Sequence, residues 1–344
     1  MNAELRDITR ERYADFLRSV SHSLFQSPAW LELVERTYPV RFHPLGCFVD
    51  GELQAVVPLL SRKLGPAVLW GSPLRQCPVP PATPLCAPSS QAASVLAALP
   101  AWVKRQRIGY LQVTVPSRVA AASDTGDWVE LLDNLELELP VSLDELWGRL
   151  AKKTRYTVRR AIKDGVKLHW ASAPAFLEAQ TRLLHDTYGR QGIRPNYPFP
   201  FYQALFAQRR ETGLRVLYAS HAGRIIAAAW VLADAERCYY WDAATADEGR
   251  ELSANHALVW TLLRWAHRRG CKSVDFVGTA RGGRAGSRPG IGHFKRAMGA
   301  EPVEYQIVYW CSPAYRLALA AYRILARVKR GITSLRRKPD DAES

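Results

Sequence analysis

The two halves of the sequence contain the same order of predicted elements: a helix, two strands that meet at a short turn, and a third strand. In the first half these are a helix from Pro28 and strands at 44–48, 52–60 and 67–70, and in the second they are a helix at 199–210 and strands at 214–219, 224–232 and 237–243. Asp50 and Gly51 are typical of a two-residue hairpin turn. Aligning Gly51 with Gly223 also aligns the apolar positions of the two hairpins, so we predict an internal duplication.

The strand at 237–243 opens the most informative unit of the chain. Its aromatic residues favour a strand that is covered on both faces. A helix with apolar residues at helical spacing follows and ends near Gly270, and a strand at 273–277 comes next. Such a connection places its two strands side by side and parallel. The second strand carries Asp275, and a glycine-rich loop leads from it to a short helix with Lys295. The pattern predicts an α/β fold with a mixed, α+β type of sheet.

This unit resembles the C-terminal domain of the Fem-like (FemAB-type) branch of the GNAT acyltransferase superfamily. The resemblance is carried by the arginine-rich segment 146–166 and by Tyr239, Tyr240, Asp275, Phe276, Gly278, Phe294, Lys295 and Gly299. The branch includes aminoacyl transferases that build peptidoglycan cross-bridges, and acetyltransferase-like proteins found beside exopolysaccharide genes. The resemblance therefore implies a role in the cell envelope, including polysaccharide biosynthesis.

The resemblance also implies two tandem GNAT-like domains. The first, at 1–140, is expected to be degenerate because it lacks a counterpart of the segment 275–295. The second, at 141–312, is expected to be the acyltransferase domain. A basic amphipathic tail at 313–344 is expected to pack back on the first domain, or to lie on an anionic membrane surface.

The implied activity is N-acyl transfer, in which an acetyl or aminoacyl group moves to an amine of a cell-envelope glycan or peptidoglycan-type precursor by direct attack. The donor is acyl-CoA or aminoacyl-tRNA, and no tightly bound cofactor is expected. GNAT enzymes hold the pyrophosphate of coenzyme A at a helix N-terminus. Here Arg250, Ser253 and Asn255 occupy that place, and both glycines of the usual signature are replaced.

Two residues are the candidate catalytic groups. Asp275, at the end of its strand, is placed to accept the proton of the attacking amine, although it could instead be a structural carboxylate that caps the loop. Lys295 is placed to hold a phosphate or an oxyanion, a role that the resemblance implies. Substrate contacts are expected from a further set of residues, of which Tyr240 could equally be a core residue: Tyr240, Asp242, Gly278 and Thr279.

A basic helix precedes the second domain. Lys152, Arg155, Arg159 and Lys163 share one helical face, with Tyr156 beside them. Because like charges on one face repel each other, we interpret Arg155, Tyr156 and Arg159 as a clamp for a phosphate-bearing substrate or a tRNA contact. The alternative interpretation is a solvated basic surface.

Composition limits the possible partners. The net charge of +15 favours a polyanion such as tRNA, an anionic membrane surface or a pyrophosphate-linked precursor, or else serves solubility alone. The six cysteines lack C-x-x-C spacing and no His/Cys cluster is present, so no metal site is expected. No signal peptide, membrane-spanning run or DNA-binding motif is visible, which predicts a cytoplasmic protein, peripheral at most at the inner face of the membrane. A non-catalytic GNAT-like module that binds tRNA or an anionic glycan precursor is the alternative function.

Overall fold

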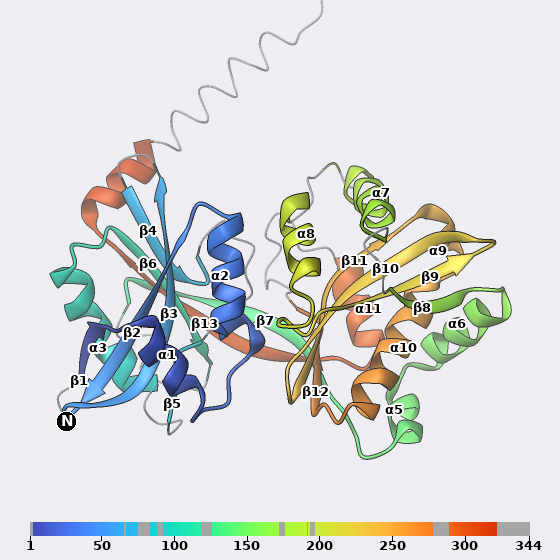
Figure 1. Ribbon diagram of the computed structural model, residues 1–344, viewed down its shortest axis with the longest axis horizontal. Coiled ribbons are helices and arrows are strands. Elements are labelled where there is room, and N and C mark those ends of the chain that lie inside the picture. Colours follow the sequence, from blue (N-terminus) through green and yellow to red (C-terminus); the bar gives the residue numbers. More distant parts are fainter. Residues whose placement is uncertain are drawn as a thin grey trace, which may run out of the picture.

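The computed structural model describes residues 3–64, 67–74, 83–87, 92–117, 126–171, 176–190, 192, 197–277 and 289–321. Within these residues one 13-stranded mixed sheet runs through two lobes (Figure 1). Its strands are β1 (Ala3–Asp7), β2 (Arg41–Val49), β3 (Glu52–Leu64), β4 (Ala67–Ser72), β5 (Leu85–Cys86), β6 (Tyr110–Pro116), β7 (Trp128–Glu138), β8 (Lys167–Ala171), β9 (Arg215–His221), β10 (Arg224–Ala233), β11 (Arg237–Thr245), β12 (Ser273–Asp275) and β13 (Glu301–Cys311).

The strand order has the same arrangement read from either end. The main path is β1-β2-β3-β4-β6-β13-β7-β12-β11-β10-β9-β8, with β5 paired to β3. In each half an antiparallel hairpin, β2–β3 or β9–β10, is followed by a parallel pair, β4–β6 or β11–β12. This arrangement agrees with the predicted tandem fold. The parallel placement of β11 and β12 is also as predicted.

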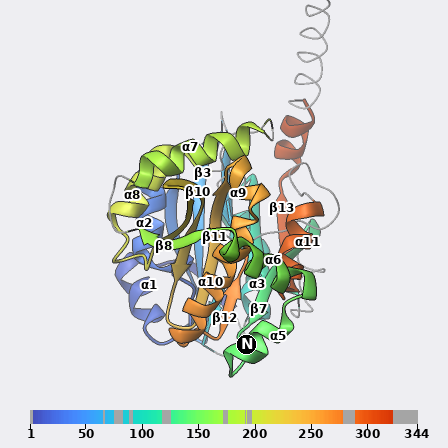
Figure 2. The same ribbon diagram turned by 90° about the vertical axis from the view of Figure 1, so that its right-hand side faces the viewer.

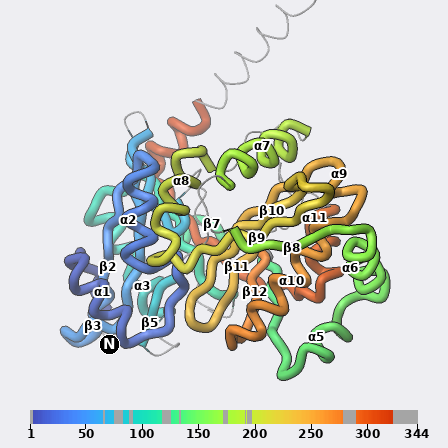
Figure 3. The backbone as a smooth tube through the Cα atoms, turned by 45° about the vertical axis from the view of Figure 1, so that its right-hand side comes forward, coloured from blue at the N-terminus to red at the C-terminus, as the bar shows by residue number. Residues whose placement is uncertain are grey.

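Each half of the sheet ends in a strand that, in the sequence, follows the other half. β7 follows the first half but pairs with β12 of the second, whereas β13 follows the second half and pairs with β6 of the first. β7 and β13 also pair with each other from Glu301 opposite Glu136 to Tyr309 opposite Trp128. The chain thus passes between the halves along β7 (Figure 3). The predicted boundaries at 140/141 and 312/313 remain predictions.

The turns of the β2–β3 and β9–β10 hairpins are formed by residues with positive φ angles. Asp50 and Gly51 have φ angles of 51° and 86°, and Ala222 and Gly223 have φ angles of 46° and 78°. Two successive left-handed residues are the geometry of the turn that suits the twist of paired strands. The predicted turns are therefore confirmed. The two-residue strand β5 pairs antiparallel with β3.

Helices cover both faces of the sheet (Figure 2). They are α1 (Arg10–Leu17), the 3-10 helix η1 (Leu24–Gln26), α2 (Pro28–Thr37), α3 (Ala92–Arg105), α5 (Leu143–Arg149), α6 (Lys152–Lys163), α7 (Phe176–Gly189), α8 (Phe199–Ala207), α9 (Asp247–Glu251), α10 (Ala254–Arg268) and α11 (Pro289–Ala297). The N-terminus of α2 is capped by Ser27, whose side chain accepts a hydrogen bond from the Trp30 amide. Residues 313–321 are helical, and the predicted tail beyond them lies outside the described residues.

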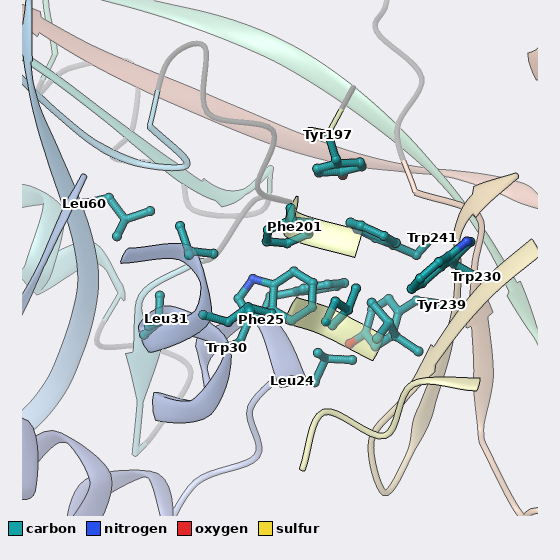
Figure 4. Close-up of a cluster of buried hydrophobic side chains, with 14 of the residues drawn as sticks. Leu24, Phe25, Trp30, Leu31, Leu60, Tyr197, Phe201, Trp230, Tyr239 and Trp241 are labelled. Atoms are coloured by element: carbon teal, nitrogen blue, oxygen red, sulfur yellow. The ribbon is translucent and has the colours of Figure 1, made fainter. Parts of the chain in front are cut away.

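An aromatic core joins the two halves (Figure 4). Trp30 of α2 lies 5.9 Å from Trp241 of β11 and 6.0 Å from Phe201 of α8, measured between ring centroids. Phe25 of η1 contacts Tyr239 of β11 at 4.7 Å. Separate cores lie under α3 in the first half and under α10 in the second. Because rings from both halves fill one core, burial of apolar surface holds the lobes together.

Candidate active site

A cavity of about 1000 Å³ lies between the two halves. The first half contributes η1 and the segment before it, including Arg18 and His22. The second half contributes β11 and the end of β12, including Tyr239 and Asp275. β7 and β13 add residues from the exchanged strands, such as Tyr305. A cavity of this size between domains is a usual place for a small-molecule site.

Asp275 is the buried carboxylate of this cavity. It is 7% exposed and ends β12, where its Cα pairs with Tyr239 of β11. Its Oδ1 accepts hydrogen bonds from the Val277 amide at 2.7 Å and from Asn134 Nδ2 at 2.9 Å. Burial, followed by the nearby charge of Glu136, raises the pKa of Asp275 to about 6. Asp275 is therefore an acid–base group that titrates close to neutral pH.

Lys295 lies next to Asp275. It comes from α11, is 5% exposed, and its Nζ donates to the Val277 carbonyl at 2.7 Å. Burial lowers the pKa of Lys295 to about 8, and the charge of Asp275 opposes that shift. The structure thus brings the two predicted catalytic residues together at Val277. Their catalytic roles remain predictions.

Four residues of this site were not expected from the sequence. Asn134 Nδ2 also donates to Glu136 Oε1 at 3.1 Å, and Tyr305 Oη donates to the same oxygen at 3.1 Å. Arg237 approaches Glu136 Oε2 at 3.9 Å. The sequence does contain one signal for Asn134 and Glu136: they alternate with Leu135 and Leu137. This period indicates a strand with one polar face.

Tyr240 and Asp242 were predicted to contact substrate, but neither lines the described cavity, whose β11 residues include Tyr239 and Trp241. Tyr240 Oη donates to Asn255 Oδ1 at 2.9 Å on the α10 side of the sheet. Asp242 accepts hydrogen bonds from Tyr202 and from the Ala243 amide, and burial raises its pKa to about 6. Their contact with a substrate remains a prediction.

Ser253 and Asn255 lie at the start of α10, as predicted, whereas Arg250 lies in α9. The short helix α9 occupies the chain directly before α10, and Ser253 is left-handed with a φ angle of 55°. Arg250 is exposed and pairs with Asp247 at 3.6 Å. A Cβ on Gly249 would lie 2.3 Å from the Ile226 carbonyl oxygen, so this glycine is required for packing of α9 on β10. Binding of a donor at this helix end remains a prediction.

The predicted basic helix is α6. Arg155 is half-buried, and its Nη1 donates to the carbonyls of Gly148 at 2.8 Å and Leu150 at 2.7 Å. Arg159 lies over the Trp147 ring at 5.2 Å, and Tyr156 is 64% exposed. Arg155 thus stabilises the C-terminal end of α5, whatever else it binds. Gly278 and Thr279 lie outside the described residues.

Among the described residues, no helix is long and apolar enough to cross a bilayer. No group of three or more His, Cys, Asp or Glu side chains in this part of the chain is arranged to hold a metal ion.

Residues 150–296 match the family described as acetyltransferase (GNAT) domain. A search of curated proteins by sequence finds no match. Among solved structures, FemX superposes with a TM-score of 0.70 at 16% identity, over 91% of this chain and 99% of FemX.

Two further structures share the fold. The C-terminal DUF2156 domain of a proposed lysylphosphatidylglycerol synthetase from Agrobacterium fabrum gives a TM-score of 0.59 at 13% identity, covering 92% of this chain and 96% of that domain. A tandem GNAT protein from the clavulanic acid biosynthesis pathway gives 0.51 at 12% identity, covering 90% and 98%. The Fem-like, tandem nature of the fold is thereby confirmed. Residues 150–296 thus match the GNAT acetyltransferase domain family, and the chain shares its two-domain fold with FemX and with the tandem GNAT protein.

Proposed function

We propose that this protein transfers an acetyl or aminoacyl group to an amine of a cell-envelope glycan or peptidoglycan-type precursor by direct attack. One observation carries the proposal: Asp275 and Lys295, an acid–base pair with pKa values near neutral, meet at Val277 beside the cavity between the halves. A carboxylate that can take a proton and an ammonium group that can bind an oxyanion are the two groups that acyl transfer to an amine requires.

In the proposed reaction the amine nitrogen attacks the acyl carbonyl carbon and forms the new C–N bond. The bond from that carbon to the ester oxygen of aminoacyl-tRNA, or to the thioester sulfur of acyl-CoA, breaks. Asp275 takes the proton from the nitrogen and passes the same proton to the leaving oxygen or sulfur, so protons and charge balance and Asp275 ends the reaction ionised. Lys295 stabilises the oxyanion that develops between these steps. No covalent enzyme intermediate is required.

The substrate class is supported by fold likeness. FemX shares the fold over 91% of this chain, and the C-terminal domain of the proposed lysylphosphatidylglycerol synthetase shares it over 92%. The name of the synthetase describes an aminoacylated membrane lipid. We therefore propose a cytoplasmic protein that meets its acceptor at the inner face of the membrane. Its net charge of +15 is suited to tRNA, to an anionic membrane surface or to a pyrophosphate-linked precursor.

The second candidate is a GNAT-like module that binds tRNA or an anionic glycan precursor without turnover. The exposed basic residues of α6 favour it: Lys152, Lys153, Arg159, Arg160 and Lys163. The replaced glycines before α10 also fit a domain that no longer holds acyl-CoA. Binding of tRNA with no turnover of any amine acceptor would favour this module over the enzyme.

Calorimetric titration with acetyl-CoA tests the donor first. Micromolar binding that Arg250→Ala weakens would assign an acetyl donor at the N-terminus of α10. Arg268→Ala is the matched control, because this exposed arginine lies at the other end of the same helix. Absence of binding would direct the assay to aminoacyl-tRNA. Turnover that survives both Asp275→Asn and Lys295→Ala would refute the site.

A further inference from the structure

Two carboxylates face each other beside the cavity. Asp275 of β12 and Glu136 of β7 are direct Cα partners in an antiparallel pair. Direct partners point to the same face of a sheet, and like charges in that position destabilise the pairing. Both side chains are largely buried, since the Asp275 residue is 7% exposed and the Glu136 side chain 11%. Such an arrangement requires compensation from neighbouring groups.

Hydrogen bonds from residues of β7 and β13 stabilise the two carboxylates. Asn134 lies two residues before Glu136 on the same face of β7, and its Nδ2 donates to both carboxylates, at 2.9 Å to Asp275 and 3.1 Å to Glu136. Tyr305 donates a further hydrogen bond to Glu136 at 3.1 Å. Arg237 of β11, the strand beyond β12, approaches the other oxygen of Glu136, Oε2, at 3.9 Å. The Asn134 amide therefore bridges the two acids, and the Arg237 guanidinium lies near Glu136.

We propose that Glu136 and Arg237 act as opposed charges that set the protonation of Asp275, with Asn134 holding the two carboxylates in place. Glu136 resists ionisation of Asp275, and Arg237 favours it. Glu136 and Arg237 are thus positioning residues that act through Asp275. A role of this arrangement in catalysis rests on the proposed acyl transfer. The effect of Glu136 and Arg237 on the protonation of Asp275 does not depend on that function.

Other ionisable side chains also lie near Asp275: Lys295, Tyr239 and Tyr305. Lys295 of α11 lies beside it, and its own pKa is lowered by burial. The pKa values of Tyr239 on β11 and Tyr305 on β13 are raised, first of all by burial, so both stay neutral across the physiological range. Burial opposes the charge of Arg237, yet Glu136 keeps the pKa of Arg237 raised, so the guanidinium remains charged. Glu136 and Arg237 are therefore the pair whose removal should have opposite effects.

Glu136→Gln and Arg237→Gln test this relationship. The glutamine in Glu136→Gln keeps an oxygen that can accept from Asn134 and Tyr305, so the change removes charge rather than shape. The readout is a carbon-13 NMR titration of the Asp275 carboxyl, assigned with Asp275→Asn. We expect the midpoint to fall by at least about half a pH unit in Glu136→Gln and to rise by a similar amount in Arg237→Gln.

A matched control comes from the same strand. Glu130 lies on the same face of β7 and accepts a hydrogen bond from Tyr309 at 2.8 Å, remote from Asp275 along the strand. Glu130→Gln should leave the Asp275 midpoint unchanged. A general loosening of the fold would move all three variants in one direction, whereas opposed charges move two of them in opposite directions.

The outcomes separate this inference from the proposed function. The inference would be overturned, even in an active enzyme, if the Asp275 titration midpoint were unchanged in both variants. It would also be overturned if Glu136→Gln and Arg237→Gln shifted that midpoint in the same direction. Opposite shifts in a protein that acylates no amine would support the inference and remove the proposed function. Opposite shifts that are matched in the acid limb of kcat/KM would support both.

Discussion

Asp275 and Lys295 are both bound to the main chain of Val277, the first through its N–H and the second through its C=O. Val277 has a φ angle of 45°, which an apolar branched residue seldom adopts. Strained backbone of this kind is found most often at functional sites. One residue thus fixes the spacing between the base and the cation of the proposed reaction.

The first prediction concerns the pH dependence of turnover. Transfer needs Asp275 ionised and Lys295 protonated, and their pKa values are about 6 and about 8. We expect kcat/KM to be bell-shaped, falling below the first value because Asp275 is protonated and above the second because Lys295 is neutral. Lys295→Arg should remove the basic limb, since a guanidinium stays charged. A basic limb that persists in Lys295→Arg would assign it to another group.

The second prediction concerns stability. The pKa of Asp275 rises from an ordinary 3.8 to about 6 on folding, so folding favours the protonated acid and stability is lost as pH rises between these values. Asp275→Asn should therefore raise the free energy of unfolding at about pH 7.5 by on the order of 1–3 kcal/mol while abolishing turnover. Urea unfolding measures the gain, which should vanish below about pH 4. A variant less stable than the parent at neutral pH would contradict this expectation.

The third prediction separates two arginines of α6. Arg155→Ala should lower the free energy of unfolding by about 1–3 kcal/mol, because the charged donor to the Gly148 and Leu150 carbonyls is lost. Arg159→Ala should cost less than about 1 kcal/mol, because its contact with Trp147 lies at the surface. Thermal unfolding of both variants gives the comparison. Equal losses would mean that the Arg155 hydrogen bonds add little.

The fourth prediction concerns the lysines of the same helix. Lys152, Lys153 and Lys163 are exposed, so changing all three to Gln should leave stability almost unchanged. If α6 binds tRNA, this change should reduce the slope of log affinity against log salt by about three. A fluorescence titration at several salt concentrations measures the slope. An unchanged slope would exclude these lysines from the binding surface.

The fifth prediction tests the boundary expected at residue 141. A fragment of residues 141–312 lacks β7, which leaves β12 with an unpaired edge and removes Asn134 from Asp275. We expect this fragment to aggregate more readily than a fragment of residues 126–312, which keeps β7 paired with β12 and with β13. Size-exclusion chromatography of both compares them directly. A monomeric, cooperatively folded 141–312 fragment would support the predicted boundary instead.

Elements determined by near neighbours could be predicted from the sequence. The hairpin turn at Asp50 and Gly51 depends on residues only a few positions apart. The parallel pair β11–β12 follows from the length of the helical crossover between its strands. The catalytic candidates were found for a similar reason, because Asp275 and Lys295 lie on either side of one loop.

Contacts between distant segments could not be predicted in this way. Asn134 and Glu136 reach Asp275 only because β7 crosses to the second half, and no local pattern indicates which strand it joins. The same limit explains Arg155: helical periodicity places it on a basic face, but the carbonyls that it binds belong to the end of α5. A single sequence indicates which residues of a strand share a face more readily than it indicates which strand lies beside it in the sheet.

The exchange of β7 and β13 also has a consequence during synthesis. The sheet of the first half is complete only when β13, near the end of the described chain, pairs with β6. Until the ribosome has made that strand, β6 leaves the exit tunnel with an open edge, although domains usually fold in the order in which they are made. The N-terminal half is thus translated first and completed last, and its open β6 edge is exposed for most of the time of synthesis.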